Sequence, residues 1–155
     1  MTKVLFVCLG NICRSPLAEA IFNHKIRELG LADVFMADSS GTSNYHIGEP
    51  PDERTLRNAR KNGVTIRHAG RQLNVADLDE YDYVYAMDNN NYHAIARLSN
   101  GARPKAQIGM IRDFDPVLKG GEVPDPYFGG ERGFQDVFEM LDRSIENLIV
   151  HLRNE

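Results

Sequence analysis

The chain has 155 residues, of which 42% are hydrophobic and 26% charged, and its net charge is −4. These values are ordinary for a globular domain and exclude a disordered chain or a fibre, while mild acidity argues against a nucleic-acid partner. No apolar run reaches the roughly 18 residues of a membrane helix, and the run at residues 4–9 is too short for a signal peptide. We expect one cytoplasmic domain spanning residues 1–155, with no membrane attachment.

The first third of the chain predicts a strand, a tight loop, a helix and a second strand. Residues 3–7 are apolar and β-branched, which is typical of a buried strand. After a short loop, Ser15 is a good helix cap, Pro16 suits the first helical position, and Gly30 suits the end of the helix. A second strand is expected at residues 34–37, and a polar, turn-rich segment at residues 38–51.

The remainder of the chain continues the alternation. We expect a helix at residues 52–62, a strand at 81–87, and a helix to about residue 98 that is capped by the Asn89-Asn90-Asn91 run. A weaker strand at 106–111 and a long Pro- and Gly-rich loop at 113–130 precede an amphipathic helix at 133–152. Such alternation predicts a doubly wound α/β domain, in which helices cover both faces of a parallel sheet.

Six cations lie close together in the middle of the chain, followed by an acidic stretch. Their spacing is helical in the first part, which favours a solvated helix face over a dedicated binding patch. The cations are Arg54, Arg57, Arg60, Lys61, Arg67 and Arg71.

The loop between Cys8 and Ser15 carries the chemistry that the sequence predicts. Its cysteine follows a buried strand, Arg14 directly precedes the helix, and Gly10 permits a tight turn. Such a loop forms a nest of N–H groups for an anion, and arginine can grip two oxygens of a phosphate. Cations and helix N-termini favour the thiolate, so we expect Cys8 to be a nucleophile at neutral pH. Taken alone, Cys8 could equally be a buried strand residue.

Residues 7–16, Val-Cys-Leu-Gly-Asn-Ile-Cys-Arg-Ser-Pro, resemble the signature of the low-molecular-weight protein tyrosine phosphatases. The family's second signature is similar to Asp125-Pro126-Tyr127, and the resemblance covers essentially the whole chain. It implies a three-layer, flavodoxin-like or Rossmann-like sandwich around a twisted four-stranded parallel sheet. Further family positions, in the same order, resemble Asp38-Ser39, Thr42-Ser43, Tyr45, Ile47-Gly48, Pro50-Pro51-Asp52, His68, Arg71-Gln72 and Met87-Asp88.

The resemblance also implies roles for individual residues. Cys8 would attack phosphorus, Arg14 would bind the phosphate, and Asp125 would act as general acid and then as base. Asp125 stands between two prolines, so without the resemblance it would be taken as a turn residue. The rest of the phosphate loop would be Leu9, Gly10, Asn11, Ile12, Cys13 and Ser15.

Supporting residues follow from the same resemblance. Asn11, Ser15, Ser39 and His68 would brace the loop, and asparagine tolerates left-handed backbone angles. Tyr45 and Tyr127 would form the aromatic walls of the cleft. No metal or cofactor is expected, and four histidines receive no role, because they lack metal-ligand spacing: His24, His46, His93 and His151.

Substrate and regulation can be anticipated in part. The expected substrates are phosphotyrosine proteins, with inorganic phosphate as product and competitive inhibitor, and the expected state is a monomer. Ile12 favours phosphotyrosine, because relatives that act on phosphoarginine carry threonine there. Cys13 would form a reversible disulfide with Cys8, although a small buried residue is the simpler alternative. Phe128 stands where many relatives have a second tyrosine, so only Tyr127 could be phosphorylated there.

Two other functions compete with this prediction. An arsenate reductase of the same fold needs two further cysteines to relay a disulfide, whereas the chain has only two cysteines in all. A non-catalytic phosphotyrosine-binding module would be expected to have lost the nucleophile or the acid, but Cys8, Arg14 and Asp125 are all present. Both alternatives are therefore disfavoured.

Overall fold

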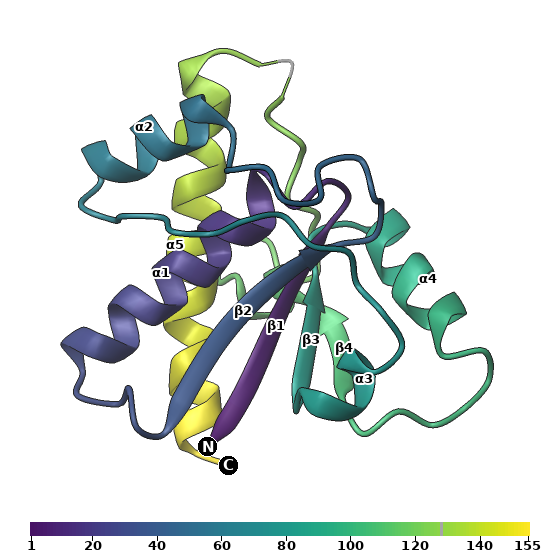
Figure 1. Cartoon of the computed structure of the whole chain (residues 1–155). Coiled ribbons are helices and arrows are strands. Elements are labelled where there is room, and N and C mark those ends of the chain that lie inside the picture. Colours follow the sequence, from purple (N-terminus) through teal and green to yellow (C-terminus); the bar gives the residue numbers. More distant parts are fainter. Residues whose placement is uncertain (128) are drawn as a thin grey trace.

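A computed structural model describes residues 1–127 and 129–155, so Phe128 lies outside the described residues. Its centre is a sheet of four parallel strands in the order β2-β1-β3-β4 (Figure 1). The predicted parallel sheet is confirmed. The strands are β1 (Thr2–Cys8), β2 (Phe35–Gly41), β3 (Tyr83–Ala86) and β4 (Gln107–Met110).

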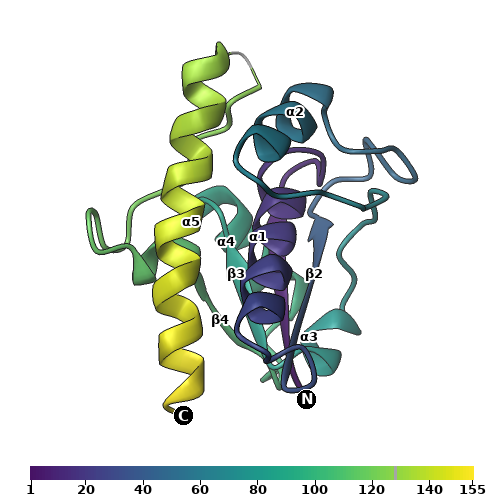
Figure 2. The same ribbon diagram turned by 90° about the vertical axis from the view of Figure 1, so that its left-hand side faces the viewer.

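Helices cover both faces of this sheet. Strand β1 alternates between the two cores: Phe6 faces the cluster formed with α1 (Arg14–Glu28) and α5 (Glu131–Arg153), whereas Leu5 belongs to the opposite cluster. Figure 2 shows α5 running alongside α1. Because β1 is buried on both faces, its run is continuously apolar, as central parallel strands require. The predicted three-layer α/β sandwich is confirmed. The remaining helices are α2 (Glu53–Lys61), α3 (Asp77–Glu80), α4 (Asn89–Leu98) and the 3-10 turn Ile111–Phe114.

Strand β2 is longer than predicted. The sequence analysis placed a turn-rich segment from residue 38 onward, but β2 pairs with β1 as far as Gly41, opposite Cys8. Polar residues at the end of β2 have partners that single-sequence patterns do not reveal. The Tyr81 hydroxyl, for example, donates to Asp38 at 3.2 Å, and Ser39 is fully buried among hydrogen-bonding side chains.

Two expectations about helix caps are wrong. Helix α1 begins at Arg14, preceded by Cys13, and Ser15 does not cap it but turns its hydroxyl toward Cys8. Helix α4 is capped by Asp88, whose carboxylate accepts from the Asn91 backbone N–H at 2.8 Å. Asparagine was expected to be the cap. Instead Asp88 and Asn91 form a capping box, in which each side chain accepts from the backbone N–H of the other residue.

Shorter elements escaped prediction altogether. Helix α3 and the 3-10 turn have four residues each, which is too few for a periodic pattern to appear. Helix α5 starts at Glu131, two residues before the predicted start at Gly133. No helix among residues 1–127 and 129–155 has both the length and the apolar character needed to cross a bilayer.

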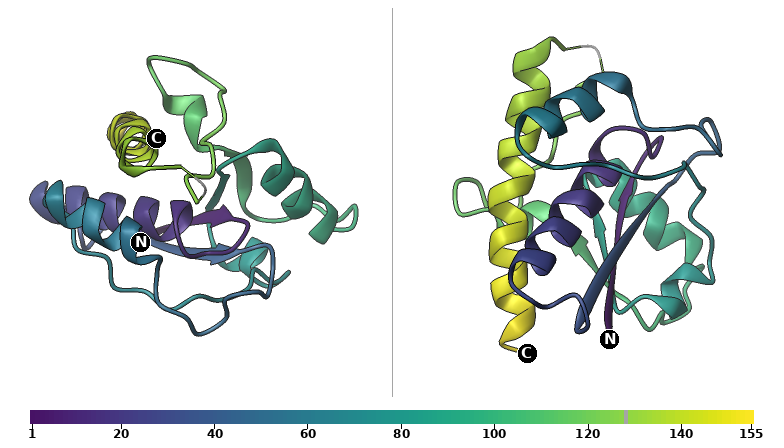
Figure 3. Two further views of the ribbon diagram at one scale, coloured as in Figure 1. Left: turned by 90° about the horizontal axis from the view of Figure 1, so that it is seen from above. Right: turned by 60° about the vertical axis from the view of Figure 1, so that its left-hand side comes forward.

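The carboxyl ends of β1 and β2 place the predicted loop at one end of the sheet, opposite the chain termini (Figure 3). A strand-end loop in such a sheet is the usual location of a ligand site. The Cys8 carbonyl accepts from Thr42 N–H at 2.9 Å, which ties this loop to the segment after β2. A Cβ at Gly41 would lie 2.8 Å from the Leu9 carbonyl oxygen, so only glycine permits this close approach.

Candidate active site

The Cys8 sulfur lies at the base of the loop that joins β1 to α1. It is 2% exposed and accepts a hydrogen bond from the Asn11 backbone N–H at 3.3 Å, and the Ser15 hydroxyl lies 3.0 Å away. Asn11 adopts a left-handed backbone with φ of 57°, a conformation that asparagine tolerates better than most residues. The loop therefore closes around the sulfur and directs polar hydrogens toward it.

The Asn11 side chain is the centre of a buried network. Its amide nitrogen donates to Ser15 Oγ at 2.8 Å and to Ser39 Oγ at 3.1 Å. Its carbonyl oxygen accepts from His68 Nε2 at 2.7 Å and from Arg71 N–H at 3.0 Å. The structure thus brings together Asn11, Ser15, Ser39 and His68, which the sequence analysis grouped, and adds the backbone of Arg71.

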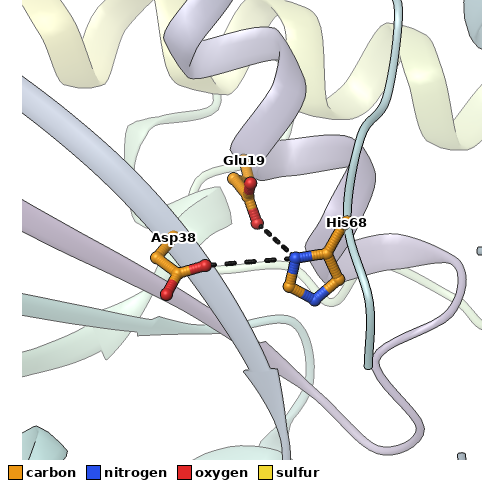
Figure 4. A group of neighbouring side chains, drawn as sticks. All are labelled: Glu19, Asp38 and His68. Atoms are coloured by element: carbon orange, nitrogen blue, oxygen red, sulfur yellow. Dashed lines mark ion pairs between the residues drawn. The ribbon is translucent and has the colours of Figure 1, made fainter. Parts of the chain in front are cut away.

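His68 joins this network to two carboxylates. Its Nδ1 lies 3.1 Å from Glu19 and 4.0 Å from Asp38, as Figure 4 shows. Both ring nitrogens have a partner, because Nε2 lies 2.7 Å from Asn11 Oδ1 and Nδ1 faces Glu19. Ser39 Oγ donates to the same Glu19 oxygen at 2.7 Å. The loop is consequently braced from α1 and β2 at once.

Glu19, Asp38 and His68 also have atoms within 4.8 Å of one another, a spacing that a metal ion would accept. Their ligand atoms are already engaged, because Glu19 accepts from both His68 and Ser39. A metal at this point would have to displace those hydrogen bonds. We therefore treat the cluster as an ion pair that supports the phosphate loop.

Two acceptors, one from Asp88 and one from Val123, fix the orientation of the Arg14 guanidinium. Its side chain is 4% exposed, and its Nη1 donates to Asp88 at 2.7 Å and to the Val123 carbonyl at 3.1 Å. Burial alone would lower the pKa of Arg14, but the nearby Cys8 and Asp88 raise it above its usual value. Nη2 lies 3.9 Å from Asp125, and within residues 1–127 and 129–155 it has no closer hydrogen-bond or ion-pair partner, so this edge of the guanidinium is available to the pocket that Arg14 lines.

An open pocket of about 300 Å³ connects these groups. Asp125 lies on its rim with a side chain that is 49% exposed, and its carboxylate accepts from the Tyr127 N–H at 3.0 Å. Tyr45 and Tyr127 line the pocket, with 70% and 43% of their surfaces exposed. Its other lining residues are Cys8, Leu9, Gly10, Ile12, Cys13, Arg14 and His46.

Cys13 lies beside Cys8 in the pocket lining, but its surroundings differ. Burial, together with the negative charge of nearby Asp52, raises the pKa of Cys13 to about 12. Both cysteines are free thiols, and Cys13 is only 6% exposed. Cys13 is therefore protonated at neutral pH.

The start of α2 links the phosphate loop to the loop that carries Asp125. Asp52 caps α2 and its N–H donates to the Ile12 carbonyl at 2.8 Å. Arg54 pairs with Asp52 at 3.0 Å, donates to the Tyr127 carbonyl at 2.8 Å, and lies 5.0 Å from the centre of the Tyr127 ring. The sequence analysis treated Arg54 as part of a solvated helix face, which is wrong for this residue.

Comparison with known proteins identifies the family. The profile described as low molecular weight phosphotyrosine protein phosphatase matches residues 3–155. The chain belongs to this family. A low molecular weight protein-tyrosine-phosphatase of Streptomyces coelicolor is 39% identical over 155 residues, which cover 99% of this chain and 94% of that protein.

Solved structures of other phosphatases have the same fold. A protein tyrosine phosphatase of Entamoeba histolytica, crystallised with Hepes in its active site, is 40% identical and superposes with a TM-score of 0.95 over 99% of this chain and 98% of that one. A Drosophila arginine phosphatase is 31% identical, with a TM-score of 0.90 and 98% coverage of both chains. This low-molecular-weight phosphatase is thus similar to solved enzymes with different substrates.

Several supporting residues of this phosphatase were not assigned roles from sequence, namely Glu19, Asp52, Arg54, Arg71 and Asp88. Asp88 and Arg71 were noticed as family positions, yet their contacts with Arg14 and Asn11 depend on tertiary packing. Arg54 carried a misleading signal, because its helical spacing with Arg57 is also typical of a solvated face.

Proposed function

We propose that the chain hydrolyses phosphotyrosine through a phosphocysteine intermediate on Cys8. The observation that carries the proposal is the position of the Cys8 sulfur, between the Ser15 hydroxyl and the Asn11 N–H, at the base of a pocket that Arg14 and Asp125 also line. A phosphate seated in this pocket would meet the loop N–H groups and the free edge of Arg14.

The first step transfers the phosphoryl group. The Cys8 thiolate attacks phosphorus, the bond to the tyrosine oxygen breaks, and Asp125 gives its proton to that oxygen. In the second step Asp125, now a carboxylate, takes a proton from water as the water oxygen attacks phosphorus. The sulfur then leaves as a thiolate, which the Ser15 hydroxyl at 3.0 Å would stabilise. Inorganic phosphate is released and would compete with substrate for the same loop.

The pocket walls support phosphotyrosine over phosphoarginine as substrate. Tyr45 and Tyr127 offer aromatic faces to a phenyl ring, whereas phosphoserine has no ring to pack against them. Ile12 lines the same pocket, where relatives that act on phosphoarginine would carry threonine. Because an arginine phosphatase is among the similar structures, assays on the three phosphoamino acid peptides side by side would test this choice.

A pair of variants tests the mechanism itself. Cys8→Ser is expected to abolish turnover of p-nitrophenyl phosphate and of phosphotyrosine peptides, while vanadate or phosphate binding stays near that of the parent protein. Arg14→Ala should lose both, because the guanidinium binds the phosphate in ground and transition states alike. Turnover by Cys8→Ser at the parental rate would refute the proposed nucleophile.

The same proposal includes the setting in which the enzyme works. We propose a cytoplasmic monomer that acts on phosphotyrosine proteins, because both cysteines are free thiols and a reducing compartment keeps a catalytic thiolate active. Sedimentation of the purified chain at assay concentrations would test the monomer, and partition of activity between cell fractions would test the compartment.

A further inference from the structure

A second pocket, of about 330 Å³, lies between α2 and the N-terminal end of α5. These two helix segments lie side by side at the upper left of Figure 1. Asn58 donates to Gln135 at 2.9 Å, and the Arg54 guanidinium lies 4.8 Å from the centre of the Phe134 ring. The full lining is Arg54, Arg57, Asn58, Lys61, Gly129, Gly130, Glu131, Arg132, Phe134 and Gln135.

The residues that line this pocket carry a net positive charge, in contrast to the net charge of −4 of the whole chain, although Asp52, outside the lining, pairs with Arg54 at 3.0 Å. Four cations line it and Glu131 is its single acid, paired with Lys61 at 3.5 Å. In the part of the chain that the structure describes, Arg57 forms no ion pair, and Arg132 pairs only with Asp136, outside the lining. The N-terminus of α5 has no side-chain cap and adds partial positive charge.

This cationic pocket adjoins the catalytic pocket across Tyr127. Arg54 lines the cationic pocket, and it donates to the Tyr127 carbonyl at 2.8 Å, whereas Tyr127 lines the catalytic pocket. A peptide whose phosphotyrosine reaches Cys8 would therefore leave the cleft beside Tyr127 within reach of Arg57 and Lys61. Because the two pockets adjoin through Arg54 and Tyr127, one peptide could place its phosphate in the catalytic pocket and a neighbouring acidic side chain in the cationic pocket.

We propose that the cationic pocket binds acidic side chains that flank the phosphotyrosine of the substrate. This inference rests on the proposed function and adds a preference for acidic phosphopeptides to it. Positive potential beside the cleft attracts carboxylates, and it also accelerates their encounter with the enzyme. The proposed contacts between pocket cations and peptide carboxylates are exposed to solvent. Loss of each contact should therefore lower kcat/KM for an acidic peptide only about two- to fivefold, and salt should weaken the preference for acidic over neutral peptides.

The test compares two phosphotyrosine peptides in parallel. One carries Asp and Glu on both sides of the phosphotyrosine, and its twin carries Asn and Gln at the same positions. The double variant Arg57→Gln/Lys61→Gln removes two charges without touching Arg54 or Tyr127. Arg27→Gln/Arg153→Gln is the matched control, because it removes the same charge near the far ends of α1 and α5.

We expect the parent protein and the control to prefer the acidic peptide at low salt. In Arg57→Gln/Lys61→Gln, the acidic-to-neutral ratio of kcat/KM should fall about three- to tenfold, with kcat and turnover of p-nitrophenyl phosphate unchanged. Equal ratios in the double variant and the parent, or no preference in the parent, would overturn the inference. Failure of the parent protein to hydrolyse any aryl phosphate would instead refute the proposed function, so the two failures are distinguishable.

Discussion

The hydroxyl oxygen of Ser15, the second residue of α1, lies 3.0 Å from the sulfur of Cys8. The same oxygen accepts from the Asn11 amide at 2.8 Å, so its own hydrogen can be donated to the sulfur or to the more distant Ser40 carbonyl at 3.4 Å. A hydrogen bond to a leaving thiolate lowers the barrier for its departure. We therefore propose that Ser15 assists the second chemical step, in which the sulfur leaves phosphorus.

Ser15→Ala is expected to slow breakdown of phosphocysteine by about 10- to 100-fold, the effect of one lost charge-assisted hydrogen bond of about 1.5–3 kcal/mol. Rapid mixing with p-nitrophenyl phosphate should then show a burst of nitrophenol followed by slow turnover. Ser40→Ala is a matched control, because the Ser40 hydroxyl is buried and has no hydrogen-bond partner in the described part of the chain. An unchanged rate in Ser15→Ala would argue against this role.

Asp125→Asn should reduce turnover in a way that depends on the leaving group. The asparagine side chain cannot act as a general acid. Hydrolysis of an aryl phosphate whose leaving phenol has a high pKa should therefore slow by about 10²–10⁴-fold, and hydrolysis of nitrophenyl phosphate, whose leaving group is activated, should slow less. The measurement is kcat/KM across a series of aryl phosphates, because this constant reports the steps up to release of the phenol and excludes the hydrolysis of phosphocysteine, in which Asp125 would act as base. An equal loss for all leaving groups would mean that Asp125 is not the acid.

The fold and the catalytic loop could be predicted from sequence because their signals are local. The apolar run of β1, Gly10 and the spacing of Cys8 and Arg14 all lie within about a dozen residues. Ser15 has the local character of a helix cap, but the same loop offers its hydroxyl two other partners, the Cys8 sulfur seven positions earlier and the Asn11 amide four positions earlier.

The supports of the site depend on residues far apart in the chain. Asp88, 74 positions after Arg14, orients the guanidinium, and nothing near either residue announces the pair. Polar side chains at the end of β2 led to the prediction of a turn, because their partners are also distant in the sequence. Their partners come from other segments, so a strand with buried polar residues looks like a loop in sequence.

A buried ion-pair cluster around Asp115 should make the fold sensitive to acid. Asp115 accepts from Arg112 and from Arg143 at 2.8 Å each, and its side chain is fully buried. Burial opposes ionisation, but the two arginines and the Val117 N–H lower the pKa of Asp115 from 3.8 to about 2. A depressed carboxyl pKa stabilises the fold above pH 4, by about 2 kcal/mol, and this contribution is lost as the pH falls toward 2.

Asp115→Ala is accordingly expected to cost about 3–5 kcal/mol at pH 7, because it also leaves the buried Arg112 without its carboxylate. Urea unfolding of parent and variant from pH 7 to pH 2 would measure the difference. The gap should narrow below pH 4. A gap that stays constant down to pH 2 would show that Asp115 does not titrate with folding.

Cys13 should protect Cys8 from irreversible oxidation, at a rate that rises with pH. Peroxide converts the Cys8 thiolate to a sulfenic acid, and the Cys13 sulfur then displaces hydroxide to form the disulfide, with water as the product. The attacking form is the thiolate, and burial raises the pKa of Cys13 to about 12. The thiolate fraction therefore grows about tenfold per pH unit through the neutral range, and disulfide closure should accelerate about 100-fold from pH 6 to pH 8.

The competing reaction is further oxidation of the sulfenic acid, so lower pH should leave more of it open to a trapping reagent such as dimedone. Mass spectrometry of dimedone adducts and of the disulfide, at a series of pH values after one peroxide pulse, would follow both products. In Cys13→Ser, peroxide inactivation should no longer be reversed by thiols. Full recovery of that variant, or disulfide closure at a rate independent of pH, would exclude attack by a buried Cys13 thiolate and leave Cys13 as a packing residue of the loop.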